Sequence, residues 1–233
     1  MPRVQSRLRN LENAVVLVTG SSRGIGAATA KAFAAEKARV IVTYYKSRDK
    51  GEQTVQECLQ AGAREAFLLE LDVTELLSIE NAKIVIEKKF GKIDVLVNNA
   101  GRIAWKKFRD QSPAEISTQL RTNLEGTVQV THAFLPVLKD CIVHIASGAG
   151  KTGFIDLAPY CASKFGIRGF SQSLGAEEPL LRMLCVNPGL TATRMTNYRG
   201  EAPERVASVI VRAVKGEIKP DEKGDVDVWK HQP

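Results

Sequence analysis

The chain alternates short runs of β-branched and other apolar residues with longer amphipathic stretches, and this alternation limits its fold more than any other feature. Residues 14–19 (Ala-Val-Val-Leu-Val-Thr) form the first run, and a continuous apolar run of this length is typical of a strand buried on both faces. Further strands are predicted at 39–43, 66–71, 93–97, 141–146 and 183–186, with a weaker one at 226–229.

Amphipathic stretches between these runs predict helices over 25–36, 52–61, 78–90, 114–138, 159–177 and 203–214. Strands and helices in alternation indicate βαβ units, and therefore an α/β fold in which helices cover both faces of a parallel sheet. Because no linker or low-complexity tract interrupts the pattern, we predict a single domain over 1–233, with residues 1–10 as a flexible N-terminal extension.

Composition excludes several classes of protein. An apolar fraction of 44% is that of a globular chain, and no apolar run approaches the ~20 residues that a membrane-spanning helix needs. The net charge of +7 suits attraction of an anionic cofactor or acidic partner as well as plain solubility. Aromatic residues are not interleaved with the basic ones, which argues against nucleic-acid binding.

The four cysteines, Cys58, Cys141, Cys161 and Cys185, show no C-x-x-C spacing and no nearby histidine pair. We therefore expect no metal site. Their mainly apolar or small-residue surroundings are typical of buried free thiols, and a reducing cytoplasm is the simplest location for the protein.

A glycine-rich segment, Thr19-Gly-Ser-Ser-Arg-Gly-Ile-Gly26, follows the first predicted strand and opens the first predicted helix. Glycine lets the backbone approach a ligand closely, and a helix N-terminus offers unpaired N–H groups, so a pyrophosphate would fit there. The alternative is an ordinary strand-to-helix turn.

The second strand ends without an acidic residue, in Thr43-Tyr-Tyr-Lys46. An acid there would favour NAD, whereas basic groups accommodate the 2′-phosphate of NADP. Arg23, together with Lys46 or Arg48, therefore favours NADP(H), although Lys46 and Arg48 are equally well read as solvated loop charges.

Tyr160 and Lys164 are four residues apart, so they share one face of a helix. A nearby lysine cation would favour the phenolate and prepare Tyr160 for acid–base chemistry. Ser147 follows the fifth predicted strand, where its hydroxyl would hydrogen-bond a substrate carbonyl. Alone, the Tyr–Lys pair is more often a solvated helix face, and the turns 98–101 and 187–189 are ordinary Asn/Gly turns. All of these segments, however, fall at the carboxyl edge of the predicted sheet, where ligands bind in such folds.

Taken together, these segments resemble the classical short-chain dehydrogenase/reductase family. The matches are Thr19–Gly26, Asp72-Val73, Asn98–Gly101, Asn123, Ser147, Tyr160-x-x-x-Lys164 and Pro188-Gly189, and they run in the family order across about residues 11–193. The resemblance implies a Rossmann-type doubly wound sheet of about seven parallel strands and a nicotinamide cofactor.

The resemblance also implies roles for individual residues. Tyr160 would be the general acid/base, Lys164 would bind the nicotinamide ribose and lower the Tyr160 pKa, Ser147 would hold the carbonyl, and Asn123 would support a proton relay. The residues implied in cofactor binding are Gly20, Ser22, Arg23, Gly24, Ile25, Gly26, Tyr45, Lys46, Asp72, Val73, Asn99, Ala100, Gly101, Tyr160, Lys164, Pro188, Gly189, Thr191 and Thr193.

Within the family the chain is most similar to 3-oxoacyl-acyl-carrier-protein reductases, which implies a small carbonyl or alcohol substrate, an acyl thioester among the candidates. Family members are usually homodimers or homotetramers, with helix 114–138 as the candidate interface. The chain departs from the pattern in a short substrate loop over 190–203, in His144 where Asn is frequent, and in 227–229, which replaces Asp-Gly-Gly.

Two other functions stay open at this point. The first is a nonenzymatic NADP-binding regulator on the same fold, which would need the glycine-rich segment but not the Ser147, Tyr160 and Lys164 set. The second is a basic protein that binds an acidic partner or nucleic acid, which would need no cofactor.

Overall fold

The computed structural model describes residues 10–231, and a seven-stranded parallel sheet forms its centre, in the order β3-β2-β1-β4-β5-β6-β7. The strands are β1 (Val15–Val18), β2 (Arg39–Tyr44), β3 (Glu65–Glu70), β4 (Ile93–Asn98), β5 (Leu138–Ile145), β6 (Arg182–Asn187) and β7 (Asp225–Asp227). The predicted Rossmann-type sheet is therefore confirmed. That residues 1–233 form one domain stays a prediction, and residues 1–9 of the predicted extension lie outside the described residues.

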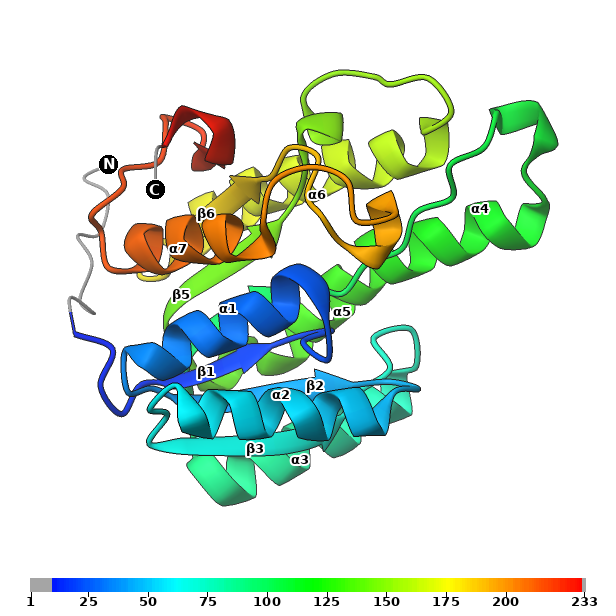
Figure 1. Cartoon of the computed structure of the whole chain (residues 1–233). Helices are drawn as coiled ribbons and strands as arrows, with labels where there is room; N and C mark the ends of the chain where they lie inside the picture. The colour runs from blue at the N-terminus through cyan, green and yellow to red at the C-terminus, as the bar shows by residue number, and fades with distance from the viewer. Residues whose placement is uncertain (1–9, 232–233) are drawn as a thin grey trace.

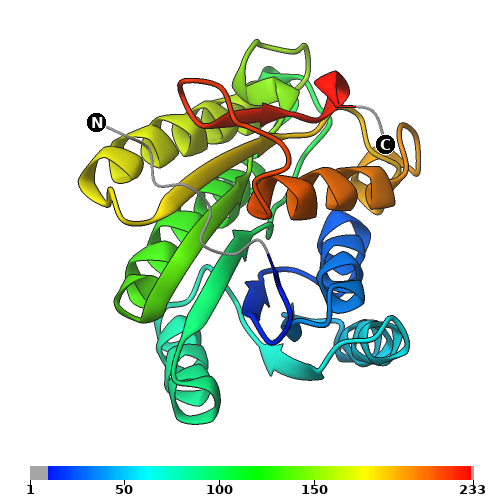
Figure 2. The ribbon, with the colours of Figure 1, turned by 90° about the vertical axis from the view of Figure 1, so that its left-hand side faces the viewer.

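Helices cover both faces of the sheet (Figures 1 and 2). One face carries α1 (Gly24–Ala35), α2 (Arg48–Gln60) and α7 (Pro203–Val214), and the other carries α3 (Leu76–Phe90), α4 (Pro113–Leu120), α5 (Gly126–Phe134) and α6 (Ala158–Glu177). The strand order reverses between β1 and β4, which is the switch point where ligands bind in doubly wound sheets.

Each face buries its own apolar core. The side chains of β1 alternate between the two cores: Val16 and Val18 pack with α1 and α7, whereas Val15 and Leu17 pack with α3 and α5. This explains why the strand is a continuous apolar run, since neither of its faces meets water. Among the described residues, no helix has both the length and the apolar character to span a bilayer.

The single helix predicted over 114–138 is wrong. The structure divides this segment into α4, a π-helical turn (Arg121–Glu125), α5 and a 3₁₀ turn (Leu135–Val137), and Leu138 already belongs to β5. Pro136 explains the end, because proline offers no N–H and disfavours helical geometry in the residue before it. The last strand also differs: β7 ends at Asp227, and a 3₁₀ turn (Val228–Lys230) follows it.

Candidate active site

A cleft of about 1870 Å³ opens at the carboxyl edge of the sheet. This volume exceeds the ~300–1,000 Å³ of a typical small-molecule site and would hold a dinucleotide together with a substrate. Every residue predicted to bind cofactor lines this cleft, and so do Ser147, Tyr160 and Lys164. Asn123 is the exception, because it lies buried beside the cleft without lining it.

The glycine-rich turn owes its shape to the lack of side chains. Gly20 and Gly24 have positive φ angles of +63° and +58°, which favour glycine. A Cβ on Gly26 would lie 2.5 Å from Asn99 Nδ2 and 2.6 Å from the Gly20 carbonyl oxygen. The turn therefore packs directly on the end of β4, and α1 begins at Gly24 with its N–H groups toward the cleft.

Hydroxyl and amide groups fasten this turn to the neighbouring strands. Thr43 Oγ1 accepts from the Gly20 N–H at 2.8 Å, and Ser21 Oγ accepts from the Thr43 N–H at 2.8 Å. Asn99 Nδ2 donates to the Thr19 carbonyl at 2.8 Å, while Thr19 Oγ1 accepts from the N–H groups of Asn99 and Ala100. The cradle is thus fixed by bonds between the ends of β1, β2 and β4.

The positive groups predicted to select the cofactor gather at the end of β2. Arg23 donates to Ser47 Oγ, and Lys46 Nζ lies 4.9 Å from the centroid of the Tyr45 ring. Arg48 behaves differently: it pairs with Glu52 along α2 at 2.8 Å and does not line the cleft. Lys46 is therefore the better placed of the two alternatives for a phosphate beside Arg23.

Asp72 and Val73 line the cleft in the segment after β3, the strand next to β2. Asp72 Oδ1 accepts from the N–H and hydroxyl of Thr74, and its own N–H donates to Ser78 Oγ at 2.9 Å. Val73 approaches Gly126 so closely that a Cβ there would lie 2.6 Å from the Val73 carbonyl oxygen. The segment Asp72-Val73 is consequently fixed by hydrogen bonds within its own loop and by close packing on α5.

From α6, Tyr160 projects toward Ser147 and Lys164 toward the carboxyl end of β5. Burial raises the pKa of Tyr160 to about 12, and the hydrogen bond with Ser147 is the effect that opposes it. Burial lowers the pKa of Lys164 to about 8. Lys164 Nζ donates to the Ile145 carbonyl at 2.8 Å and lies 5.6 Å from the centroid of the Tyr160 ring. In this structure Ser147 is the group whose hydrogen bond lowers the Tyr160 pKa, and the same role for Lys164 stays a prediction.

Asn123 lies in the π-helical turn between α4 and α5. Its Oδ1 accepts from the Arg102 N–H at 2.7 Å, and its Nδ2 donates to the Arg102 carbonyl at 2.8 Å and to Ser163 Oγ at 3.1 Å. The side chain thus joins the segment after β4 to the helix that carries Tyr160 and Lys164.

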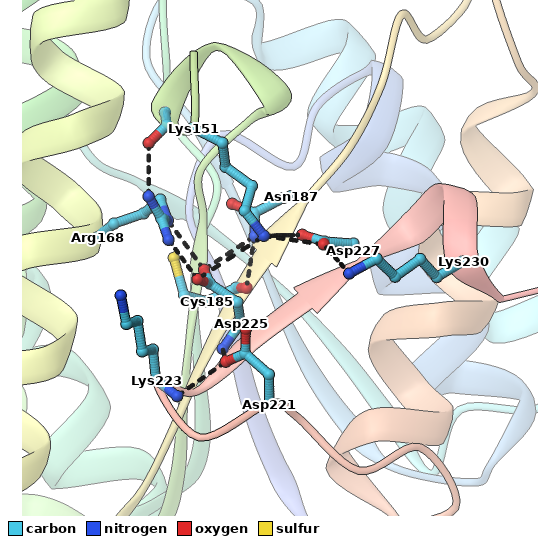
Figure 3. Close-up of polar contacts among 10 residues, drawn as sticks. Lys151, Arg168, Cys185, Asn187, Asp221, Lys223, Asp225, Asp227 and Lys230 are labelled. Atoms are coloured by element: carbon cyan, nitrogen blue, oxygen red, sulfur yellow. Dashed lines mark hydrogen bonds and ion pairs between the residues drawn. The ribbon is translucent and has the colours of Figure 1, made fainter.

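An ion network that the sequence did not indicate holds the turn after Ser147 (Figure 3). Arg168, one turn beyond Lys164 on α6, donates to Asp225 Oδ1 at 3.0 Å and to the Gly150 carbonyl at 2.8 Å. Lys151 Nζ donates to Asp227 Oδ1 at 2.6 Å. The two acids come from β7, so the last strand anchors the 3₁₀ turn Gly148–Gly150 next to the catalytic candidates.

Asp225 and Asp227 are both buried, and Asn187 Nδ2 donates to them at 2.9 and 3.0 Å. Burial alone would raise the pKa of Asp225, but hydrogen bonds from Arg168 and Asn187 outweigh it and leave that pKa below its ordinary value. Hydrogen bonds from Lys151, Lys230 and Asn187 likewise outweigh burial and lower the pKa of Asp227, so both carboxylates stay ionised at neutral pH. No short motif signals this network, because its members are spread along the chain from Lys151 to Lys230, which pairs with Asp227 Oδ2 at 2.8 Å.

His144 takes no part in the cleft. It is fully buried on β5 beside Phe170, and its Nδ1 lies 3.2 Å from Asn98 Nδ2. Burial, with a contribution from the Lys164 charge, lowers the pKa of His144 to about 3, so the ring is neutral. The four cysteines are buried free thiols, and residues 10–231 contain no acid, His and Cys cluster that could hold a metal ion.

Comparison with known proteins agrees with this geometry. Residues 14–204 match the family model for short chain dehydrogenases. The chain is 30% identical to a short-chain dehydrogenase/reductase of Aspergillus fumigatus over 96% of its own length and 95% of the relative's. It is 34% identical to the 3-oxoacyl-(acyl-carrier-protein) reductase FabG of Escherichia coli, over 90% of its own length and 85% of the relative's.

A third relative is an NADP-dependent 3-hydroxy acid dehydrogenase of Schizosaccharomyces pombe, 29% identical over 88% of this chain and 82% of that protein. Among solved structures, a short chain dehydrogenase of Burkholderia cenocepacia in complex with NADP superimposes with a TM-score of 0.85. Its sequence is 26% identical, and the match covers 94% of this chain and 97% of that one.

Proposed function

Because the chain belongs to the short-chain dehydrogenase/reductase family, and is therefore an oxidoreductase of CH–OH and C=O groups, we propose that it uses NADP(H) with Tyr160 as general acid/base. The observation that carries this proposal is the convergence of Ser147, Tyr160 and Lys164 on the cleft that also contains the glycine-rich turn. A nonenzymatic cofactor sensor would need the turn but not the other three side chains.

The cleft fits a dinucleotide. The cradle formed by Gly20, Gly24 and Gly26 has no room for side chains and offers helix N–H groups to a pyrophosphate. Arg23 and Lys46 would hold an adenosine 2′-phosphate, and the similar Burkholderia structure is a complex with NADP. When bound, the nicotinamide supplies or accepts the hydride.

The protein's own residues supply placement and the proton. Ser147 holds the substrate oxygen next to the Tyr160 hydroxyl. Tyr160 gives its proton to that oxygen during reduction and removes it during oxidation. Lys164 is mostly a cation at pH 7, because its pKa is about 8, so it stabilises the phenolate as the proton leaves. Asn123 fixes the position of α6 relative to the Arg102 backbone, because its side chain bonds to both.

Several finer properties belong to the same proposal. NADP(H) is preferred over NAD(H) because residues 43–46 at the end of β2 include no acid, and Arg23 of the glycine-rich turn reaches Ser47 next to Lys46. The relationship to FabG makes an acyl thioester one substrate candidate. The cytoplasm is the proposed compartment, because free thiols persist in reducing surroundings.

We also propose a homodimer or homotetramer. The outer surface of α4 and α5 bears a shallow apolar depression lined by Ile116, Leu120, Leu124 and Val128. A second copy of the chain would bury these side chains, and light scattering on the purified protein would give the mass of the assembly.

The test is NADPH consumption by the purified protein with 3-oxoacyl thioesters, ketones, diketones, quinones, aldehydes and keto sugars. Tyr160→Phe should lower kcat by about 10²–10⁴-fold, because it removes the transferred proton, and it should leave NADPH affinity unchanged. Unchanged turnover in Tyr160→Phe would overturn the assignment. NADPH binding without turnover of any carbonyl class would favour the regulator.

A further inference from the structure

We infer that Trp105 determines substrate specificity, and that it selects carbonyl compounds with an aromatic or branched apolar body over short polar ones. This inference rests on the proposed function, since it concerns the substrate end of the same cleft. It follows from how three loops meet there and from the side chains that they expose.

Trp105 and Lys106 join the three loops around the substrate end. The Trp105 indole N–H donates to the Met195 carbonyl, in the loop after β6, at 2.8 Å. The Lys106 N–H donates to the Asp156 carbonyl, in the loop between β5 and α6, at 3.1 Å. Trp105 and Lys106, in the loop after β4, thus bind the loops after β5 and β6. We call the edge that these three loops form around the substrate end of the cleft the rim.

The short loop after β6 is itself internally bonded. The Ala192 N–H donates to the Glu201 carbonyl at 2.7 Å, and the Glu201 N–H donates to the Leu190 carbonyl at 2.9 Å. Thr196 Oγ1 donates to the Thr191 carbonyl at 2.6 Å. The rim is consequently formed before substrate arrives, so its side chains act as a fixed template for the substrate's shape.

The side chains on this rim are large and apolar, yet exposed. Trp105 is 53% exposed and Tyr198 is 74% exposed, and Phe154, Leu190 and Met195 are each 40–50% exposed. Clusters of exposed apolar side chains mark binding surfaces. Behind the rim, Ile103 and Tyr160 both pack against the buried cluster that includes Leu157, so the apolar wall continues inward to the catalytic tyrosine.

Trp105 presents only its ring to a substrate. Its single hydrogen-bond donor is already used by the Met195 carbonyl, and an indole has no acceptor. The hydroxyl groups of a keto sugar would give up hydrogen bonds to water when they pack on this ring, and the ring offers none in return. An aryl group would instead gain aromatic contact with it. Lys106, the adjacent cation, is paired with Glu115 at 3.2 Å.

The test compares two diketones that differ in one phenyl group, 1-phenylpropane-1,2-dione and butane-2,3-dione. The wild-type protein should show kcat/KM at least about tenfold higher for the phenyl compound, because an apolar pocket rewards the added surface. Trp105→Ala should raise KM for the phenyl compound about tenfold and change kcat/KM for butanedione less than about twofold. Trp105→Phe keeps a ring and should retain most of the preference.

Trp229→Phe is the matched control, because Trp229 is the other tryptophan of the chain, is 45% exposed and does not line the cleft. Trp229→Phe should leave kcat/KM unchanged for both diketones. Equal losses for both diketones in Trp105→Ala, or no preference in the wild type, would overturn the inference while the proposed function stands.

A binding measurement separates the two claims if neither diketone is turned over. The double variant Tyr160→Phe/Trp229→Phe has Trp105 as its sole tryptophan. Its fluorescence should change saturably with 1-phenylethanol and not with butan-2-ol at the same concentration. This result would support the inference even where absent turnover counts against the proposed function, and an equal or absent response to the two alcohols would overturn the inference.

Discussion

The half of the cleft around the glycine-rich turn presents backbone to a ligand, whereas the half around Ser147 and the rim presents side chains. In the first half, close packing of Gly20, Gly24 and Gly26 and bonds from Thr43 and Asn99 fix the cradle. In the second half, buried ion pairs support the turn after Ser147, and an indole hydrogen bond closes the rim.

This difference matches the ligands that the two halves would take. A dinucleotide presents the same phosphates and riboses to every enzyme that uses it, so a rigid backbone cradle suits it. Substrates vary, and side chains on loops can change without altering the sheet. The comparison predicts that damage to each half has separable effects on cofactor binding, catalysis and stability.

The largest effect is expected from Asp225→Asn in the side-chain half. It removes a buried carboxylate from Arg168 and Lys151, and breaking a buried ion pair from one side costs about 3–5 kcal/mol of folding free energy. Urea unfolding would measure this loss, with exposed Asp110→Asn as the control. The folded fraction should bind NADPH normally and show lower kcat. Lost NADPH affinity in that fraction would break the division between the halves.

Gly26→Ala should produce the next largest effect, in the backbone half. Its Cβ would overlap Asn99 and the Gly20 carbonyl, and overpacking of this kind costs about 1–3 kcal/mol. NADPH affinity, measured by fluorescence titration, should fall by about 100-fold as the cradle shifts. In the control Gly169→Ala the added Cβ meets nothing within 4 Å. Normal NADPH binding by Gly26→Ala would contradict the close packing.

These two expectations show what the sequence could reveal. The cradle was predictable because a close backbone approach demands glycine at particular positions. The ion network and rim were not, since Trp105 and Met195 are 90 residues apart and nothing local marks their contact. The wrong prediction of one helix over 114–138 has a local cause and a tertiary cause. Its end at Pro136 follows a local rule, whereas the π-helical turn places Asn123 on the Arg102 backbone, a tertiary contact.

Lys164 links the two halves and gives a smaller, pH-dependent effect. Its pKa is lowered on folding to about 8, so between pH 8 and about 10.4 the unfolded chain binds more protons, and the Lys164 contribution makes stability rise with pH. Below pH 8 the cost of the buried cation is constant. The free energy of unfolding of Lys164→Met, relative to that of wild type, should therefore be roughly 1–3 kcal/mol more favourable at pH 7 than at pH 10.5.

Denaturant unfolding of wild type and Lys164→Met at pH 7 and pH 10.5 measures this difference. The variant lacks the bond to the Ile145 carbonyl at both pH values, so the loss of that bond cancels when the two pH values are compared. An identical stability difference at pH 7 and pH 10.5 would show that burial does not lower the Lys164 pKa. Turnover should be lost at either pH.

Arg23→Ala should have the smallest effect and the most selective one. NADPH affinity should fall about tenfold, as one charge-assisted contact to a phosphate is removed, and NADH affinity should not change. Arg48→Ala is the matched control, because Arg48 pairs with Glu52 outside the cleft. Equal losses for NADPH and NADH would place Arg23 away from the 2′-phosphate.

The division of labour within the cleft is tested most directly by one crossed measurement on Arg23→Ala, Trp105→Ala and the double variant. NADPH affinity and KM for 1-phenylpropane-1,2-dione would be determined for each protein under the same conditions. We predict that Arg23→Ala weakens only NADPH binding, that Trp105→Ala raises only KM, and that the double variant shows both changes at their single-variant sizes. A Trp105→Ala protein that loses NADPH affinity as strongly as Arg23→Ala would contradict the account.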